Sequence, residues 1–138
     1  MNIDKENAEQ CWISLILRVA MASLFGVAAA SKFMMGLGVA SANIQGMFQA
    51  TWLPSWLVAP YASLLPFMEA IIAIWLIVGI KLRTAWIFTA FVLISLAFGM
   101  VVVQNAGAAN IYMYVLIACA GLYFSRYDCC ALGSCCKK

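Results

Sequence analysis

The sequence predicts an all-α integral membrane protein, folded as a bundle of four transmembrane helices. Of its 138 residues, 67% are hydrophobic and only 9% are charged, whereas soluble domains carry about 25% charged residues. A chain of this size cannot bury so much apolar surface inside itself. Its apolar stretches are long enough to cross a hydrocarbon core of about 30 Å. No stretch shows the alternating pattern of a membrane β-barrel, so helices are expected.

Four segments approach the roughly 20 apolar residues that a transmembrane helix needs. They are residues 12–34, 57–80, 84–104 and 108–125. The last two would read as one long apolar run without the polar, glycine-bearing sequence QNAGAAN between them, which is typical of a tight turn. We therefore expect one four-helix domain over residues 1–128, followed by a cysteine-rich tail over residues 129–138.

The first segment is expected to remain in the protein as a transmembrane helix. The sequence before it, MNIDKENAEQ, is acidic and polar rather than basic, and the apolar run is too long for the core of a signal peptide.

The connection between the first two spans is expected to lie at the membrane interface. It is rich in aromatic residues, which favour that region, and it contains Pro54 with Pro60 close behind. We predict a short interfacial helix or re-entrant segment over the outer mouth of the bundle.

The distribution of lysine and arginine predicts that both termini face the cytoplasm. Basic residues flank the membrane on the cytoplasmic side. On the side of the two termini the basic residues are Lys5, Lys81, Arg83, Arg126, Lys137 and Lys138, whereas Lys32 stands alone on the opposite side.

Three ionisable residues within or beside the spans are the candidate functional residues. Glu69 is the one acidic residue between Glu9 and Asp128, and the first span carries Arg18 and Lys32. An isolated ion in a membrane costs at least about 2.5–3.5 kcal/mol on insertion scales, so Glu69 should pair with a cation from the first span. Arg18 and Lys32 are both possible partners.

Such a buried pair has two interpretations, and the sequence leaves both open. It can be a structural link that fixes the register of two helices, with Lys32 extending toward the headgroups. Alternatively, Glu69 can exchange a proton or orient a ligand, because ionisable residues inside membranes often mark functional sites.

The tail DCCALGSCCKK contains Cys129, Cys130, Cys135 and Cys136 as two adjacent pairs. Four thiolates can bind zinc, copper(I) or an iron–sulfur cluster, or can cycle as disulfides. The spacing is not that of a common zinc ribbon. A tail of reduced, unliganded thiols and S-palmitoylation beside the membrane are the other interpretations.

The sequence resembles the DoxX-like family, in its broader DoxX and MauE type. The resemblance rests on LRVAMASLFGVAAASKFM (residues 17–34) and on PFMEAIIAIWLIVGIKLRTAWIFTAFVLI (residues 66–94). It implies a four-helix protein of the bacterial inner membrane. It also implies an association with quinone-linked redox complexes or with the maturation of redox proteins, and it points to Arg18, Lys32 and Glu69.

The composition also limits the possible functions. The sequence has no histidine, which excludes a His-ligated haem or a histidine base within this chain. Its scattered basic residues and net charge of +3 make nucleic acid an unlikely partner.

We expect a small subunit of a quinone-linked redox complex, embedded in lipid beside other membrane subunits. A non-catalytic accessory or scaffold subunit is the alternative, and a solute transporter is less favoured because four helices show no inverted repeat.

Overall fold

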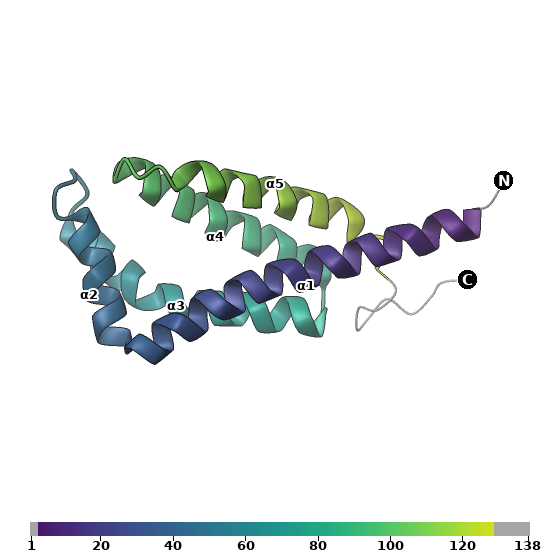
Figure 1. Cartoon of the computed structure of the whole chain (residues 1–138), viewed down its shortest axis with the longest axis horizontal. Coiled ribbons are helices and arrows are strands. Elements are labelled where there is room, and N and C mark those ends of the chain that lie inside the picture. The colour runs from purple at the N-terminus through teal and green to yellow at the C-terminus, as the bar shows by residue number, and fades with distance from the viewer. Residues whose placement is uncertain (1–2, 129–138) are drawn as a thin grey trace.

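The computed structural model describes residues 3–128, with side chains from residue 8 onward, and this part of the chain is all-α (Figure 1). Its helices are α1 (Ile3–Met35), α2 (Leu37–Phe48), α3 (Ser55–Val78), α4 (Leu82–Val102) and α5 (Ala108–Phe124). The predicted all-α fold class is therefore confirmed for the described residues.

Three of these helices are long and apolar enough to cross a membrane. They are α3, α4 and the part of α1 from Ala8 to Met35. The predicted fourth span is α5, which has 17 residues and is therefore about 25 Å long at 1.5 Å per residue. That length falls short of a hydrocarbon core of about 30 Å, so a fourth crossing stays a prediction. Helix α1 also begins well before residue 12, the predicted start of the first span.

Four of the helices form two pairs, and α2 lies across one end of these pairs (Figure 1). Helix α1 packs along α3, and α4 forms a hairpin with α5. Helix α1 starts at the end of the bundle where α3 turns into α4 and where α5 finishes. We call this the terminal end. Helix α2 lies across the opposite end, which we call the α2 end, and packs mainly on α3.

The helix boundaries follow local backbone chemistry. Gly36, with a φ of +92°, separates α1 from α2 in a conformation that other residues rarely adopt. Pro54 precedes α3 as its N-cap residue. The predicted break between α4 and α5 is present, and there the Asn105 side chain accepts a hydrogen bond of 2.8 Å from the Gly107 N–H. A short helix, α2, is present between the first two predicted spans, and its position at the membrane interface stays a prediction.

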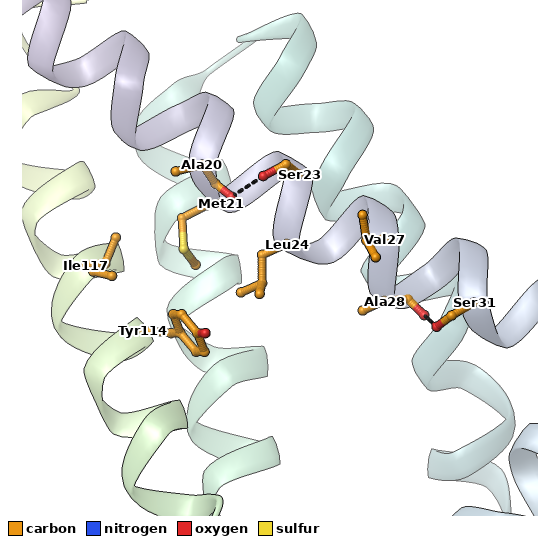
Figure 2. A pocket seen from close by; sticks show the side chains of 9 residues that line it. All are labelled: Ala20, Met21, Ser23, Leu24, Val27, Ala28, Ser31, Tyr114 and Ile117. Carbon is orange, nitrogen blue, oxygen red and sulfur yellow. Dashed lines mark hydrogen bonds between the residues drawn. The ribbon is translucent and has the colours of Figure 1, made fainter.

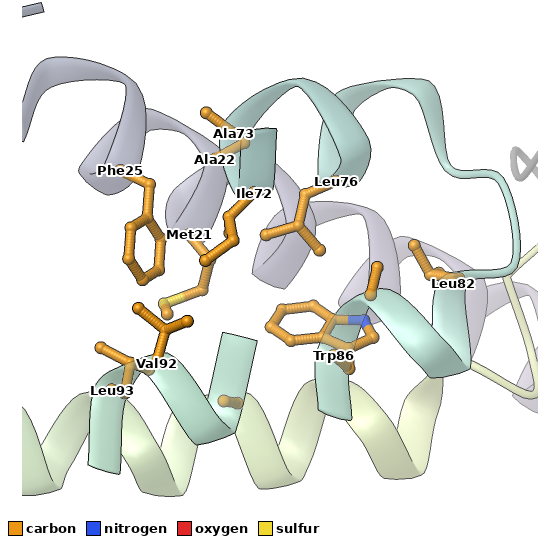
Figure 3. Packing of buried hydrophobic residues seen from close by; sticks show 12 residues of the cluster. Met21, Ala22, Phe25, Ile72, Ala73, Leu76, Leu82, Trp86, Val92 and Leu93 are labelled. Carbon is orange, nitrogen blue, oxygen red and sulfur yellow. The ribbon is translucent and has the colours of Figure 1, made fainter. Parts of the chain in front are cut away.

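The hydrophobic core lies between the two helix pairs (Figure 3). Met21 and Phe25 of α1 and Ile72 of α3 face the fully buried indole ring of Trp86 on α4 or the aliphatic residues beside it. Helix α5 approaches α4 closely at Gly121, which has no side chain. A Cβ atom at this residue would collide with the Trp86 ring of α4. Close approach through small residues is the usual way in which membrane helices pack.

Candidate functional site

Glu69 is paired with Lys32. The Lys32 Nζ donates hydrogen bonds of 2.6 and 2.5 Å to the two carboxylate oxygens of Glu69. Only 4% of the Glu69 side chain is exposed, against 20% of the Lys32 side chain. Next to the pair in sequence, Phe33 and Phe67 pack edge to face with ring centroids 5.5 Å apart. Of the two cations expected for Glu69, the structure therefore selects Lys32.

Arg18 lies at a second buried junction, toward the terminal end. Its Nε donates to the Leu76 carbonyl at 2.8 Å, and its Nη2 donates to the Ile77 carbonyl at 3.0 Å. These carbonyls belong to the last turn of α3, where backbone acceptors lack partners within the helix. A cation is also favoured at the negative end of the helix dipole. Arg18 thus caps the C-terminus of α3.

The remaining contacts of Arg18 tie α1 to the chain beyond α5. Its Nη1 is 3.1 Å from both carboxylate oxygens of Asp128, and the Ser14 hydroxyl donates to one of those oxygens at 2.8 Å. The Arg18 and Asp128 side chains are 6% and 1% exposed. We call Ser14, Arg18 and Asp128 the terminal clamp.

Arg18, the other possible partner of Glu69, pairs with Asp128 instead. Arg18 and Lys32 lie 14 residues apart on α1, which corresponds to roughly 21 Å along the helix axis, and each of them bonds a different carboxylate. The described part of the chain therefore contains two separate buried ion pairs rather than one shared polar site.

Sequence reasoning missed Asp128 and Ser14. Asp128 follows the last apolar segment and resembles a solvated tail residue, and Ser14 resembles an ordinary small residue in a membrane helix. One signal was available: the predicted spans contain two cations, Arg18 and Lys32, but one acidic residue, Glu69, and Asp128 is the next acidic residue after Glu69.

A directed chain of hydrogen bonds fixes α2 to α3. The Gln45 side chain donates to the Ser41 hydroxyl at 3.0 Å, and the Ser41 and Ser63 hydroxyls are 3.3 Å apart. Ser63 itself donates to the Ala59 carbonyl at 3.0 Å. Because a hydroxyl has one hydrogen, Ser41 must be the donor to Ser63. A cavity of about 330 Å³ between α2 and α3 is lined by Ser41, Gln45 and Ser63 among others.

A second polar contact joins α3 to α4 near the α2 end. Tyr61 and Ser95 have their hydroxyl oxygens 2.7 Å apart, and Ser95 also donates to the Val92 carbonyl at 2.8 Å. Tyr61 is therefore the donor to Ser95. The two residues border an otherwise apolar cavity of about 200 Å³, which Phe48 of α2 and Phe98 of α4 also line.

An open groove between α1 and α5 has a volume of about 520 Å³ (Figure 2). Leu24 and Val27 of α1 line it opposite Tyr114 of α5. The two serine hydroxyls in the groove, Ser23 and Ser31, donate to carbonyls of their own helix. The groove is therefore an apolar surface suited to lipid chains or to another helix.

The predicted metal ligands Cys129, Cys130, Cys135 and Cys136 lie outside the described residues. Within residues 8–128, no group of three His, Cys, Asp or Glu side chains could hold a metal ion. The part of the chain described contains Cys11, which is half-buried on α1, and Cys119, which is exposed on α5.

Fold and site together define the class of the protein. It is an α-helical membrane protein in which two cations of α1, Arg18 and Lys32, bond to α3, and both of these helices are long enough to span the bilayer. The profile of the family described as methylamine utilisation protein MauE matches residues 10–111. The chain belongs to this family. Comparison with curated proteins finds no match, and neither does comparison with solved structures.

The family match confirms the resemblance at the level of the membrane protein family, with MauE rather than DoxX as the family matched. The matched residues include Arg18, Lys32 and Glu69 but end before Asp128. The terminal clamp therefore joins the matched region to a residue outside it.

Proposed function

We propose that the protein is a small membrane subunit of a redox-linked pathway of the bacterial inner membrane, and that its role there is accessory. The observation that carries the proposal is the pairing of its intramembrane charges with each other. Arg18 bonds two carbonyls of α3 as well as Asp128, and Lys32 bonds both oxygens of Glu69.

Buried charges that are paired with each other in this way favour a structural role for these residues. Removing one member of a buried ion pair is strongly destabilising, whereas replacing both members with apolar residues is often neutral. Such a pair therefore specifies how helices associate without performing chemistry. The sequence has no histidine, and a redox reaction in this pathway would use the cofactors of partner subunits.

The family description names methylamine utilisation, and we extend that pathway class to this chain as part of the proposal. The protein would then assist the assembly or maturation of a redox enzyme, with apolar helix faces available to partner helices. Exposed large apolar residues such as Val27, Ile74 and Phe91 lie on α1, α3 and α4. Both termini would face the cytoplasm.

The proposal is tested by deleting the chain and isolating the redox enzyme with which it co-purifies in mild detergent. An accessory role predicts less assembled enzyme in the membrane, with unchanged turnover per assembled enzyme. Normal assembly combined with lost turnover would contradict it and would assign a catalytic role to the chain.

Quinone-linked chemistry at Lys32 and Glu69 is the second candidate function. The observation that favours it is the partial exposure of the Lys32 side chain, 20% against 6% for Arg18. A partly exposed ammonium group beside a buried carboxylate can exchange a proton or donate to a carbonyl oxygen of a quinone.

A double substitution distinguishes the two candidates. Lys32→Met combined with Glu69→Met keeps apolar packing and removes both charges. Quinone reduction by the purified complex should continue if the pair is structural, and should stop, with assembly intact, if the pair carries protons. Arg126→Ala is the control, because Arg126 is exposed.

A further inference from the structure

A further cavity at the α2 end has polar groups but no charge in its lining. It has a volume of about 370 Å³ and lies between the C-terminal half of α2 and the start of α3. Apolar and polar side chains share its lining, which consists of Phe48, Leu53, Val58, Gln45, Gln49 and Ser55. We call it the polar cavity. Its polar groups are two amides and one hydroxyl.

These polar groups can bind a ligand because most of them are not used within the described part of the chain. Gln45 donates one amide hydrogen to the Ser41 hydroxyl. The side chains of Gln49 and Ser55 form no hydrogen bond with another described residue. A side-chain amide offers two donors and one acceptor oxygen, and a hydroxyl both donates and accepts. A ligand that matches this lining must therefore donate as well as accept hydrogen bonds.

Helix α2 turns its polar side toward the bundle. Ser41, Gln45 and Gln49 recur every four residues and therefore lie on one side of the helix. Val39 and Met47 are exposed instead. A helix that covered a bundle from the aqueous side would place its apolar residues inward and its amides in water. The reversed arrangement is the one expected for a helix that has lipid outside it and a polar space beneath it.

The polar cavity adjoins the cavity of about 200 Å³ that Tyr61 and Ser95 border, which we call the apolar cavity. Phe48, Leu53 and Val58 line both. The hydroxyls of Tyr61 and Ser95 are already bonded to each other. An apolar cavity of about 150 Å³ is large enough to bind benzene, so the apolar cavity can hold part of a hydrocarbon chain.

Two tryptophans lie beside these cavities in the sequence. Trp52 and Trp56 are both exposed, and between them are Leu53 and Ser55, which line the polar cavity. Tryptophan favours the boundary between water and hydrocarbon, which supports the interfacial position predicted for this segment. Molecules that occupy this boundary have a polar headgroup and an apolar chain.

We propose that the two cavities form one binding site for an uncharged amphiphile whose headgroup carries several hydroxyls, as in acylglycerols and glycolipids. The headgroup lies in the polar cavity, and the chain passes Phe48 into the apolar cavity. Hydroxyls both donate and accept, whereas the carbonyls of a quinone only accept. A phosphate or carboxylate headgroup would find no cation in the lining.

The site is separate from the two buried ion pairs, because none of their members lines either cavity. The proposal therefore does not depend on the proposed function. A bound amphiphile would contact α2, α3 and α4 together, since residues of all three helices line the apolar cavity. It would thus stabilise the position of α2.

The test titrates the full-length protein in lauryldimethylamine oxide, a detergent without hydroxyls in its headgroup, with monooleoylglycerol. Native mass spectrometry should show one bound molecule per chain, and the amides of α2 should exchange hydrogen several-fold more slowly. Oleate has a similar chain and an anionic headgroup, and it should bind at least about tenfold more weakly because its charge stays unpaired. Octyl glucoside in the same assay distinguishes a sugar from a glycerol headgroup, and the tighter ligand identifies the source.

Each cavity has its own variant and matched control. Gln49→Leu removes an exposed amide of the polar cavity and should weaken binding about three- to tenfold, as for one lost hydrogen bond. Asn43→Leu, also exposed on α2 but outside both cavities, should leave it unchanged. Gly99→Leu fills the apolar cavity and should weaken binding at least about tenfold through overpacking. Gly46→Leu is its control, because a Cβ atom there meets nothing within 4 Å.

Three results would overturn the proposal. Equal affinities for oleate and monooleoylglycerol would mean that the headgroup is not recognised. Equal affinities of the Gly99→Leu and Gly46→Leu variants, together with equal affinities of the Gln49→Leu and Asn43→Leu variants, would place the bound lipid elsewhere. The last is a wild-type protein that binds neither monooleoylglycerol nor octyl glucoside stoichiometrically.

Discussion

Arg18 joins three parts of the chain, and its position depends on a glycine. Gly79 ends α3 with a φ of +74°, and a Cβ atom at this residue would lie 3.0–3.1 Å from the Arg18 guanidinium. Glycine is therefore required at this position for two reasons. Its backbone conformation is one that other residues rarely adopt, and the guanidinium occupies the space that a side chain would need.

Replacement of Gly79 should consequently be costly. We expect Gly79→Ala to lower the free energy of unfolding by about 1–3 kcal/mol, the cost of a strained left-handed residue, as measured by denaturant unfolding in mild detergent. The matched control is Gly38→Ala on α2, where a Cβ meets nothing within 4 Å and the change should be neutral or slightly stabilising. Equal effects of the two variants would contradict the account of the Arg18 junction.

For individual residues, the sequence identified the buried charges but not the partner of each charge. The need of Glu69 for a cation follows from the cost of an ion in lipid, and that pairing is confirmed with Lys32. The choice between Arg18 and Lys32 depends on how α1 and α3 are aligned, which periodicity does not fix. Asp128 lies outside the apolar segments, so no pattern within the spans indicates that it folds back onto Arg18.

The elements show a similar division between what can and cannot be predicted. The four apolar segments and the turn before α5 follow from hydropathy and from the sequence QNAGAAN. Proline and aromatic residues also indicated an interfacial segment where α2 lies. The contact of α2 with α3 depends on three polar side chains, Ser41, Gln45 and Ser63, whose spacing carries no recognisable motif.

The attachment of α2 to α3 can be tested through Ser63. The variant Ser63→Ala removes the acceptor for Ser41 and should cost about 0.5–1.5 kcal/mol, the usual net value of a hydrogen bond. Amides of α2 should then exchange hydrogen several-fold faster, measured by mass spectrometry. Ser31→Ala is the control, because Ser31 is exposed and bonds only its own helix. Unchanged exchange in α2 after the Ser63 substitution would contradict the hydrogen-bonded chain.

For the whole molecule, the central question is how often the chain crosses the membrane. Helices α1, α3 and α4 are long enough to cross, and α5 is shorter. Nevertheless, α1 starts and α5 finishes at the same end of the bundle (Figure 1). Four crossings, with the start of α1 and the end of α5 on one side of the membrane, therefore stay the prediction to be tested.

Topology can be measured with single cysteines in a cysteine-free variant. Arg83→Cys and Arg126→Cys should react with a membrane-impermeant maleimide only after the cell membrane is permeabilised. Asn105→Cys, in the turn between α4 and α5, should react in intact spheroplasts. Labelling of the Arg126 position together with the Asn105 position in intact spheroplasts would show that α5 does not cross, and the predicted four-span topology would be wrong.

The pairing of the intramembrane charges is tested most directly by double-mutant cycles of unfolding free energy in mild detergent. Methionine substitutions at Lys32 and Glu69, and methionine at Arg18 with leucine at Asp128, provide the two cycles expected to couple. Each should show an interaction energy of about 0.5–3 kcal/mol, as for residues in contact. The cycle between Arg18 and Glu69 should stay within roughly 0.3–0.5 kcal/mol of additivity. Strong coupling in this third cycle, with additivity in the other two, would contradict the two-pair arrangement.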